Sequence, residues 1–370
     1  MPIYMDIHHV PGIEAIDAAE AHRKDMLIQE EHQCKCMTYW IDVNRGVVFC
    51  LIEAPDKSTV EEMHRKSHGL VPNKIIEVKN DLVESFLGRI HDPENATISG
   101  SGLKVFSESA LRVLLVTNMT DPVLLRHELG AEKANDLLTR QYNAIRKECA
   151  IHGGREVEHV GDGFIASFSS AANAVSCALE IQTKMPPGDR NVTAFKMAVN
   201  AGEPVAKSEK LFGDTIQVAR YLCTITSSNR LVVSSSVKEL LAGDFFQKVR
   251  NNVMTLPPHD LSLVQSLFHT LEENWQDANF DVTEFCQALA VSKSRLYRAT
   301  TTLWSLPPNG LLKEFRLDKA RELLKRQSGN IAQTTFDSGF SSPSYFTKCF
   351  KKKFGLLPAM YLDALTQFYH

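Results

Sequence analysis

The chain contains 370 residues and carries a formal charge of −3. At about 100–200 residues per domain, this length predicts two or three domains. An apolar fraction of 44% excludes wholesale disorder, and no apolar run approaches the ~20 residues of a membrane span. The first ten residues, MPIYMDIHHV, do not resemble a signal peptide, and eight cysteines without a dense framework fit a reducing compartment. We therefore expect a cytoplasmic protein that does not contact a membrane.

Charge is unevenly distributed along the chain. Residues 283–370 carry eight Lys and five Arg against six Asp and Glu, a charge of +7, so the preceding residues carry −10. An acidic front joined to a basic end suggests that a module for binding polyanions is attached to something else. Charge alone leaves open whether the basic segment binds a polyanion or is only a solvated face.

Two loop-like segments divide the chain into three blocks. The segment 90–102 is rich in Gly, Ser, Asn, Asp and Pro, and the segment 254–260 contains a Pro-Pro pair that interrupts a helix. We therefore predict domains at residues 1–85, 105–250 and 262–370.

The first block alternates strand-like and helix-like patterns. We predict strands at 3–9, 37–43, 47–53 and 74–78, with helices at 14–31 and after a capping Ser58. This βαββαβ order is typical of a ferredoxin-like sheet.

The second block repeats a similar order. We predict strands at 110–116, 155–160, 164–167, 194–200 and 231–234, with helices within 121–152 and 170–183.

The third block contains no convincing strand, and its apolar residues recur at helical spacing. We predict helices at 261–275, 282–290, 296–303, 311–324, 331–338 and 345–354. Ser292 can cap one of them, and Ser341 or Ser342 another. The chain is thus predicted to be a multidomain protein in which two α+β ferredoxin-like domains precede an all-α domain of tandem helix-turn-helix units.

Three motifs of the last block are LYR at 296–298, FRLDKARELL at 315–324 and GFSSPSYFTKCFKKKFGLLPAMY at 339–361. They resemble the DNA-binding domain of AraC/XylS-family transcription regulators. The resemblance implies that double-stranded DNA is the partner and that two recognition helices enter successive major-groove segments.

Candidate DNA-contacting residues follow from their positions in these two helices. They are Ser294, Arg295 and Arg298 in the first helix and Pro343, Ser344, Thr347 and Lys348 in the second. Lys351, Lys352 and Lys353 would supply phosphate contacts or only solubility. Arg298 could also be a structural or phosphate contact rather than a base-reading residue.

The middle block resembles class III adenylate and guanylate cyclases in HGGREVEHVGDGFIASF at 152–168, AANAVSCALEIQ at 171–182, MAVNAGEPVA at 197–206 and LFGDTIQVARYL at 211–222. Cyclase chemistry needs two metal-binding Asp, a purine-reading Lys, an Asn and an Arg. Asp162 matches one metal position, whereas the other four positions hold Asn118, Glu158, Gln217 and Tyr221, with Arg220 one place from the Arg position. We therefore expect no catalytic residues, no enzyme activity and no bound nucleotide.

The first block contains six His within 61 positions. His64 and His68 are spaced i, i+4 on one predicted helix, so both imidazoles project from the same face and suit one divalent metal. The motifs MPIYMDIHHVPG, AHRKDM, YWIDVNRGVVFCLIEAP and MHRKSHGLVPNKIIEV resemble a small family of ferredoxin-like proteins that includes nickel-responsive members. The resemblance implies a ligand set drawn from His8, His22, Cys50, His64 and His68.

Nickel is the favoured metal, and zinc and copper remain open because nitrogen and thiolate ligands suit all three. The alternative interpretation is that His8 and His22 are ordinary packed histidines and Cys50 a small apolar residue.

These features predict a homodimeric transcription regulator that responds to a metal or a small ligand, with RNA polymerase as a further partner. One alternative is a metal-binding or enzymatic, cyclase-like front half fused to a DNA-binding tail. Another is a metal-storage or trafficking protein whose tail binds DNA without sequence preference.

Overall fold

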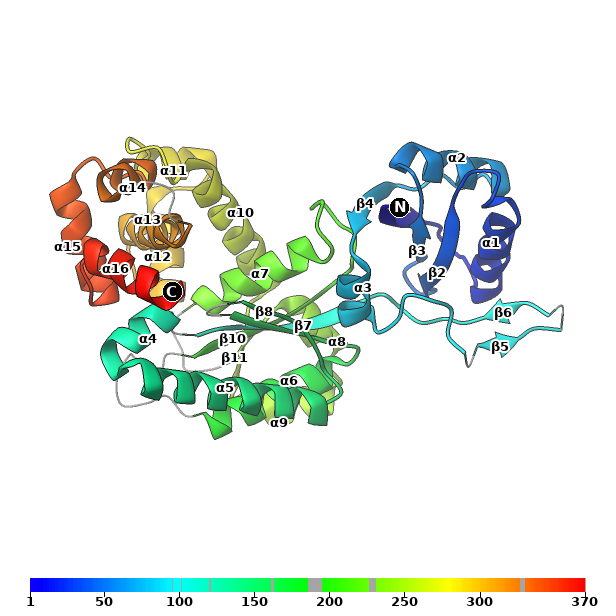
Figure 1. The fold of residues 1–370 in the computed structure, drawn as a ribbon, viewed down its shortest axis with the longest axis horizontal. Helices are drawn as coiled ribbons and strands as arrows, with labels where there is room; N and C mark the ends of the chain where they lie inside the picture. Colours follow the sequence, from blue (N-terminus) through cyan, green and yellow to red (C-terminus); the bar gives the residue numbers. More distant parts are fainter. Residues whose placement is uncertain are drawn as a thin grey trace.

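The computed structural model describes residues 1–94, 96–100, 102–119, 121–160, 163–185, 195–225, 231–326 and 330–369. The chain forms three bodies in sequence order: a first domain that ends in β4, a middle domain around a larger sheet, and a helical domain (Figure 1). Within the described part of the chain, no helix is both long enough and apolar enough to cross a membrane.

The first domain is built on a four-stranded antiparallel sheet in the order β2-β3-β1-β4. Its strands are β1 (Ile3–His9), β2 (Lys35–Asp42), β3 (Val47–Glu53) and β4 (Lys74–Val78), and its helices are α1 (Ala15–Ile28) and α2 (Lys57–Ser67). The element order is the predicted one. The predicted cap of α2 is wrong, because Asp56 rather than Ser58 accepts the N–H of Thr59, at 2.8 Å.

Both faces of this first sheet are buried. Side chains alternate between the faces of a strand, and one face, which includes Tyr4 and Val48, packs beneath α1 and α2. The opposite face, which includes Met5 and Phe49, packs against α3 (Asn80–Leu87) and against residues of the middle domain such as Phe212. The first and middle domains therefore share one apolar core.

The middle domain contains a six-stranded sheet in the order β12-β11-β10-β7-β9-β8. Its strands are β7 (Arg112–Asn118), β8 (Arg155–Val160), β9 (Gly163–Phe168), β10 (Lys196–Gly202), β11 (Leu231–Val233) and β12 (Val253–Thr255). Its helices are α4 (Pro122–Leu129), α5 (Ala131–Ile151), α6 (Ala171–Lys184), α7 (Gly213–Thr224), α8 (Ser235–Leu240) and α9 (Gly243–Val249). Helices α5 and α6 cover one face of the sheet and α7 the other (Figure 1).

The predicted segment 121–152, for which one or two helices were expected, forms two helices, because Gly130 has a φ of 81° and interrupts the α-helical backbone between α4 and α5. One prediction about the middle domain needs correction. The segment 254–260 is not simply a linker, since β12 pairs in parallel with β11 and α10 begins within the segment, at Pro258. The sheet thus has two strands beyond a βαββαβ core.

The helical domain contains no strand among its described residues. It consists of α10 (Pro258–Asn274), α11 (Val282–Ala288), α12 (Lys293–Trp304), α13 (Pro308–Lys325), α14 (Ile331–Asp337), α15 (Pro343–Phe354) and α16 (Pro358–Tyr369). Helix α16 was not predicted. Gly355, with a φ of 79°, ends α15, and Pro358 occupies the first turn of α16, where its missing N–H costs nothing.

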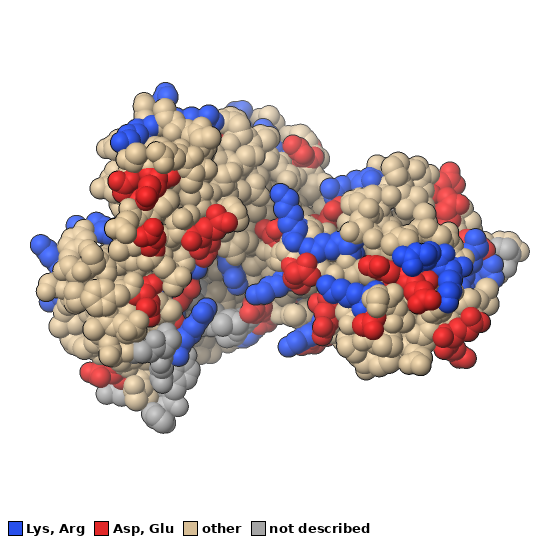
Figure 2. Space-filling view, turned by 90° about the horizontal axis from the view of Figure 1, so that it is seen from above, with Lys and Arg blue, Asp and Glu red and all other residues tan. Residues whose placement is uncertain are grey.

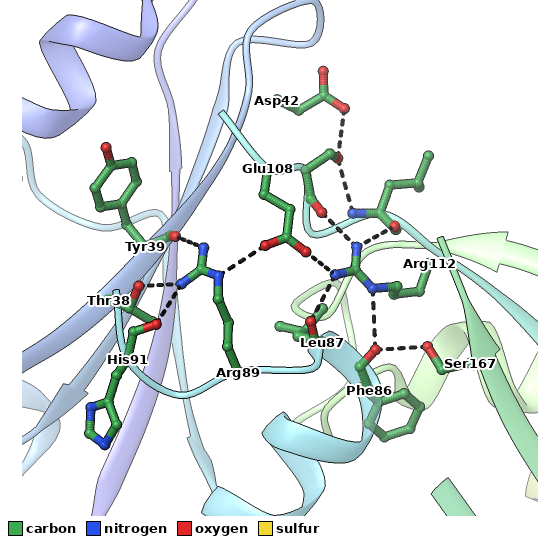
Figure 3. Close-up of polar contacts among 12 residues, drawn as sticks. Thr38, Tyr39, Asp42, Phe86, Leu87, Arg89, His91, Glu108, Arg112 and Ser167 are labelled. Carbon is green, nitrogen blue, oxygen red and sulfur yellow. Dashed lines mark hydrogen bonds and ion pairs between the residues drawn. The ribbon is translucent and has the colours of Figure 1, made fainter. Parts of the chain in front are cut away.

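Two arginines and one glutamate connect the first domain to the middle domain (Figure 3). Arg112, at the start of β7, is 2% exposed and donates to the main-chain oxygens of the last two residues of α3. Glu108 accepts from Arg112 at 2.8 Å and from Arg89 at 2.9 Å, and Arg89 also donates to the main-chain oxygen of Tyr39 in β2. A short hairpin of β5 (Thr97–Ile98) and β6 (Lys104–Val105) lies between Arg89 and Glu108 in the sequence.

Charged side chains of both signs also gather on the surface where these two domains meet (Figure 2). Glu209 pairs with Lys57 at 3.2 Å and with Lys74 at 3.0 Å, and Arg45 pairs with Glu203 at 2.8 Å. Because these pairs are largely exposed, each contributes little stability. The buried Arg112 is therefore expected to stabilise this junction more than these exposed ion pairs do.

Arg112→Ala should lower the free energy of unfolding of the full chain by about 3 kcal/mol, because it leaves buried carbonyl oxygens without donors. Arg146→Ala is the matched control, since Arg146 pairs with Glu156 on the surface, where a pair contributes about 0–1 kcal/mol. Chemical denaturation followed by tryptophan fluorescence measures both variants. Equal destabilisation by the two variants would contradict the prediction.

Candidate metal centre and DNA-binding surface

Buried metal-ligating side chains gather between the sheet of the first domain and its two helices. Two overlapping groups have ligand atoms within 4.8 Å of one another. One contains Asp6, His8, Cys50 and His64, and the other contains Asp25, His64 and His68. Strands β1 and β3 supply Asp6, His8 and Cys50, α1 supplies Asp25, α2 supplies His64, and His68 follows the last residue of α2.

His64 lies at the centre of this cluster and is completely buried. Its Nε2 is 3.0 Å from Asp6 Oδ2, and its Nδ1 is 3.2 Å from Asp25 Oδ1 and 3.0 Å from His68 Nε2. The backbone also fixes Asp6, whose carboxylate accepts the N–H of Cys50 at 3.2 Å. Hydrogen bonds therefore connect four separate elements in the cluster: β1, β3, α1 and α2.

The negative charges of Asp6 and Asp25 affect the protonation of His64, which lies between them. Burial by itself would lower the pKa of His64, but Asp6 and Asp25 together raise that pKa to about 10. Burial would raise the pKa of both carboxyl groups, yet the adjacent histidines hold each pKa well below its usual range. The two carboxylates therefore favour the protonated form of His64.

The imidazole of His8 has ring nitrogens that are available to bind a metal ion. It is 4% exposed, and neither ring nitrogen makes a hydrogen bond to a described residue. Nε2 lies 3.2 Å from Asp6 Oδ1, but the geometry is not that of a hydrogen bond. Buried polar atoms normally have partners, so a metal ion fits the unpaired nitrogens. Two or three imidazoles, a carboxylate and a thiol suit nickel, zinc or copper.

The cysteine of the cluster is a thiol rather than a thiolate in this state. Burial, with Asp6 next, raises the pKa of Cys50 well above its usual value. A thiolate is the form that binds metal, so Cys50 would have to lose its proton on coordination. The protonated His64 would likewise have to release a proton, whereas the carboxylates of Asp6 and Asp25 are already in the form that binds a metal.

The structure brings together four of the five sequence-predicted ligands. His22, on α1, belongs to neither group; its Nε2 lies 3.7 Å from Asp92 and its ring lies 5.3 Å from that of Tyr39. Asp6 and Asp25 were missed by the sequence analysis. Asp6 could have been found, because it lies two residues before His8 on a strand and therefore faces the same side.

The helical domain exposes the predicted residues of its first recognition helix, α12. Ser292 caps α12 by accepting the N–H of Arg295 at 3.2 Å. Leu296, Thr300, Leu303 and Trp304 are buried, which leaves Ser294, Arg295 and Arg298 exposed on the opposite side. Such a free helix face is what major-groove contact requires.

The second recognition helix, α15, is capped by Ser342, which accepts the N–H of Tyr345. Phe346, Cys349 and Phe350 are buried. The predicted contacts Pro343, Ser344, Lys348, Lys351 and Lys352 are exposed, and Thr347 is half-buried. Lys353 differs from its neighbours because it is ion-paired with Glu314 at 2.9 Å and Asp318 at 2.8 Å on α13. It therefore holds α15 against α13, and it is not free for a phosphate.

The cyclase-like positions of the middle domain are dispersed among different environments. Asp162 lies outside the described residues, and Asn118 is exposed at the end of β7. Tyr221 stacks on Phe268 of α10, with ring centroids 4.2 Å apart. Glu158, Gln217 and Arg220 line a cleft of about 740 Å³ between the first and middle domains, together with Lys79 and Lys210.

Comparison with known proteins divides the chain in a similar way. Residues 285–364 match a family model for a helix-turn-helix domain, and residues 4–78 match the model of the nickel responsive protein SCO4226-like family. The chain is 37% identical over 114 residues to histidine kinase P4 of Formosa agariphila, covering 31% of this chain and 8% of that protein. It is 29% identical over 112 residues to putative adenylate cyclase 3 of Rhizobium meliloti, covering 29% and 19% respectively.

A solved structure of a transcriptional regulator from Chromobacterium violaceum, titled as containing an AraC-type DNA-binding domain, is also similar. It is 24% identical with a TM-score of 0.27, and the match covers 28% of this chain and 91% of that one. The chain spans less than a fifth of the length of the two curated relatives named above.

These observations define a multidomain chain that ends in a helix-turn-helix domain, a type of domain that places a recognition helix in the major groove of double-stranded DNA. Over these residues the chain is similar to AraC-type DNA-binding domains. The N-terminal domain is a SCO4226-like domain of the nickel-responsive family, and the middle of the chain is similar to nucleotide cyclases.

His8→Ala should abolish or strongly weaken metal binding by the full chain, by more than the roughly 10–100-fold that loss of an outer-shell partner costs. Calorimetric titration with NiCl₂ should give about one site per chain for the unmodified protein. His9→Ala is the matched control, since His9 is exposed on the other side of β1. The double variant His64→Ala/His68→Ala should also lose the site. Unchanged titration of the His8 variant would rule out this ligand set.

Arg295→Ala should weaken binding to a preferred DNA sequence by about 1–3 kcal/mol if Arg295 reads a base. Fluorescence anisotropy on a duplex selected by the protein and on a scrambled duplex separates the two roles. Arg140→Ala, on the exposed side of α5, should leave both affinities unchanged. An equal loss on both duplexes would assign Arg295 to a phosphate.

Proposed function

We propose that this protein is a sequence-specific transcription regulator whose DNA binding responds to a divalent transition metal, with nickel favoured over zinc or copper. The observation that carries the proposal is the buried cluster of Asp6, His8, Cys50 and His64, in which neither ring nitrogen of His8 makes a hydrogen bond to a described residue. The match of residues 4–78 to the nickel-responsive family supports the same metal. The strand order and the two helices support a ferredoxin-like arrangement around the cluster.

A metal would change the charge balance within the first domain. Asp6 and Asp25 favour the protonated form of His64, so metal binding by its ring would release that proton while the cation supplied the positive charge. Asp25 on α1 and His68 at the end of α2 would then have to adjust their contacts. Because the other face of the sheet shares a core with α3 and the middle domain, such an adjustment can bias the arrangement of the domains.

The middle domain serves in this proposal as a connecting domain without cyclase activity. Tyr221 stacks on Phe268 of α10, and Glu158 places a negative charge where a purine-reading lysine would be needed.

We further propose that the chain forms a homodimer, which would place four recognition helices on the DNA. RNA polymerase would be contacted at the promoter.

A small-molecule effector is the second candidate for the signal. It is favoured by the cleft that Lys79, Lys210 and Arg220 line between the first and middle domains.

Nickel should change the affinity of the full chain for a selected duplex by about 5-fold or more, which is the lower end of typical allosteric coupling. The measurement compares anisotropy titrations in NiCl₂ with titrations in chelator, using MgCl₂ as the control for divalent charge. The His8→Ala variant should bind the same duplex without any nickel effect.

Identical affinities of the unmodified chain in nickel and in chelator would contradict the metal response. A steep salt dependence without preference between selected and scrambled duplexes would instead favour a metal-storage protein with a nonspecific DNA-binding tail.

A further inference from the structure

One buried carboxylate joins the middle domain to the second helix-turn-helix unit. Asp121 caps α4 by accepting the N–H of Val123 at 2.9 Å, and its side chain is fully buried. Its other oxygen lies 2.8 Å from Lys325 Nζ and 3.4 Å from Arg321 Nη1, and it accepts the hydroxyl of Tyr361 at 2.8 Å. Lys325 and Arg321 lie on α13 and Tyr361 lies on α16, so one side chain contacts three helices.

The environment of Asp121 favours its charged form in spite of burial. Burial alone would raise the pKa of this carboxyl group, but Lys325 and Arg321 bring its pKa below the usual value. The contact is also apolar, since Val123 of α4 belongs to the same buried cluster as Phe346 and Phe350 of α15. The core beneath the second recognition helix therefore extends into the middle domain.

The first helix-turn-helix unit is held at a different place on the middle domain. Trp304, at the end of α12, donates its indole N–H to Thr224 of α7 at 2.9 Å. Tyr221 of α7 stacks on Phe268 of α10. The two units thus dock on separate elements, the first on α7 and the second on α4, and α13 connects them.

We propose that Asp121 is a positioning residue for DNA recognition: by fixing α13 and α16 to α4, it sets the orientation of α15 relative to α12. The two recognition helices must reach successive major-groove segments, and a small misorientation of one unit removes its base contacts while the other keeps them. This inference rests on the proposed sequence-specific DNA binding, but it does not depend on the metal response.

Asp121→Asn in the full chain isolates this role. Asparagine caps a helix as well as aspartate does, so the variant removes the charge that Lys325 and Arg321 contact while the start of α4 is retained. Glu128→Gln, on the exposed side of the same helix, is the matched control. Tyr361→Phe removes only a hydroxyl from the same contact, and it provides a second variant with less risk to folding.

The measurement is selection from a pool of duplexes with a randomised central region, followed by sequencing. The unmodified chain should specify two blocks of base pairs about one duplex turn apart. Asp121→Asn should lower the base preference in the block read by α15 by about 5-fold or more, and Tyr361→Phe should lower it to a smaller extent. Both variants should keep the block read by α12, and Glu128→Gln should keep both blocks.

Three outcomes would overturn the proposal or its basis. Two intact blocks in both the Asp121 and the Tyr361 variants would show that the contact does not position α15. Equal loss of both blocks in both variants would show a general effect on the domain rather than on one unit. No preferred sequence for the unmodified chain would instead overturn the proposed function itself.

Discussion

A charged side chain can stay buried only where the fold supplies it with partners, and in this protein such side chains lie at several of the contacts between parts of the chain. Arg112 joins α3 to β7, and Asp121 joins α4 to α13 and α16. His64 joins α2 to α1 and β1 through two carboxylates. Each of these groups is surrounded by apolar residues that would be costly to separate, so polar pairing and packing specify the same arrangement.

Strand β7 occupies a special place in this arrangement. Arg112 begins the strand, and Asp121 follows its last residue by three positions. The contact with the first domain and the contact with the second helix-turn-helix unit are therefore connected by one strand inside a six-stranded sheet. A sheet strand held on both sides is stiff, which gives the middle domain a structural role that needs none of the groups of a cyclase.

The elements themselves were largely predictable. The strands of the first domain and the capped helices α12 and α15 follow from period-two alternation, helical periodicity and Ser caps, which are local properties. One error was local as well, because Asp56 rather than Ser58 caps α2. Strand β12 was missed because three residues beside a Pro-Pro pair carry too short a pattern to be recognised.

By itself, the sequence determined the order of the elements and the basic helical end of the chain, because these depend on residue type and spacing. The family resemblance also pointed to four of the side chains that lie in the cluster. Only the tertiary structure decided that Asp6 and Asp25 meet His64, that His22 faces Asp92 instead, and that Lys353 is an ion-pair partner of α13. Those pairings join residues far apart in the chain, and their strength depends on burial, which a local pattern does not report.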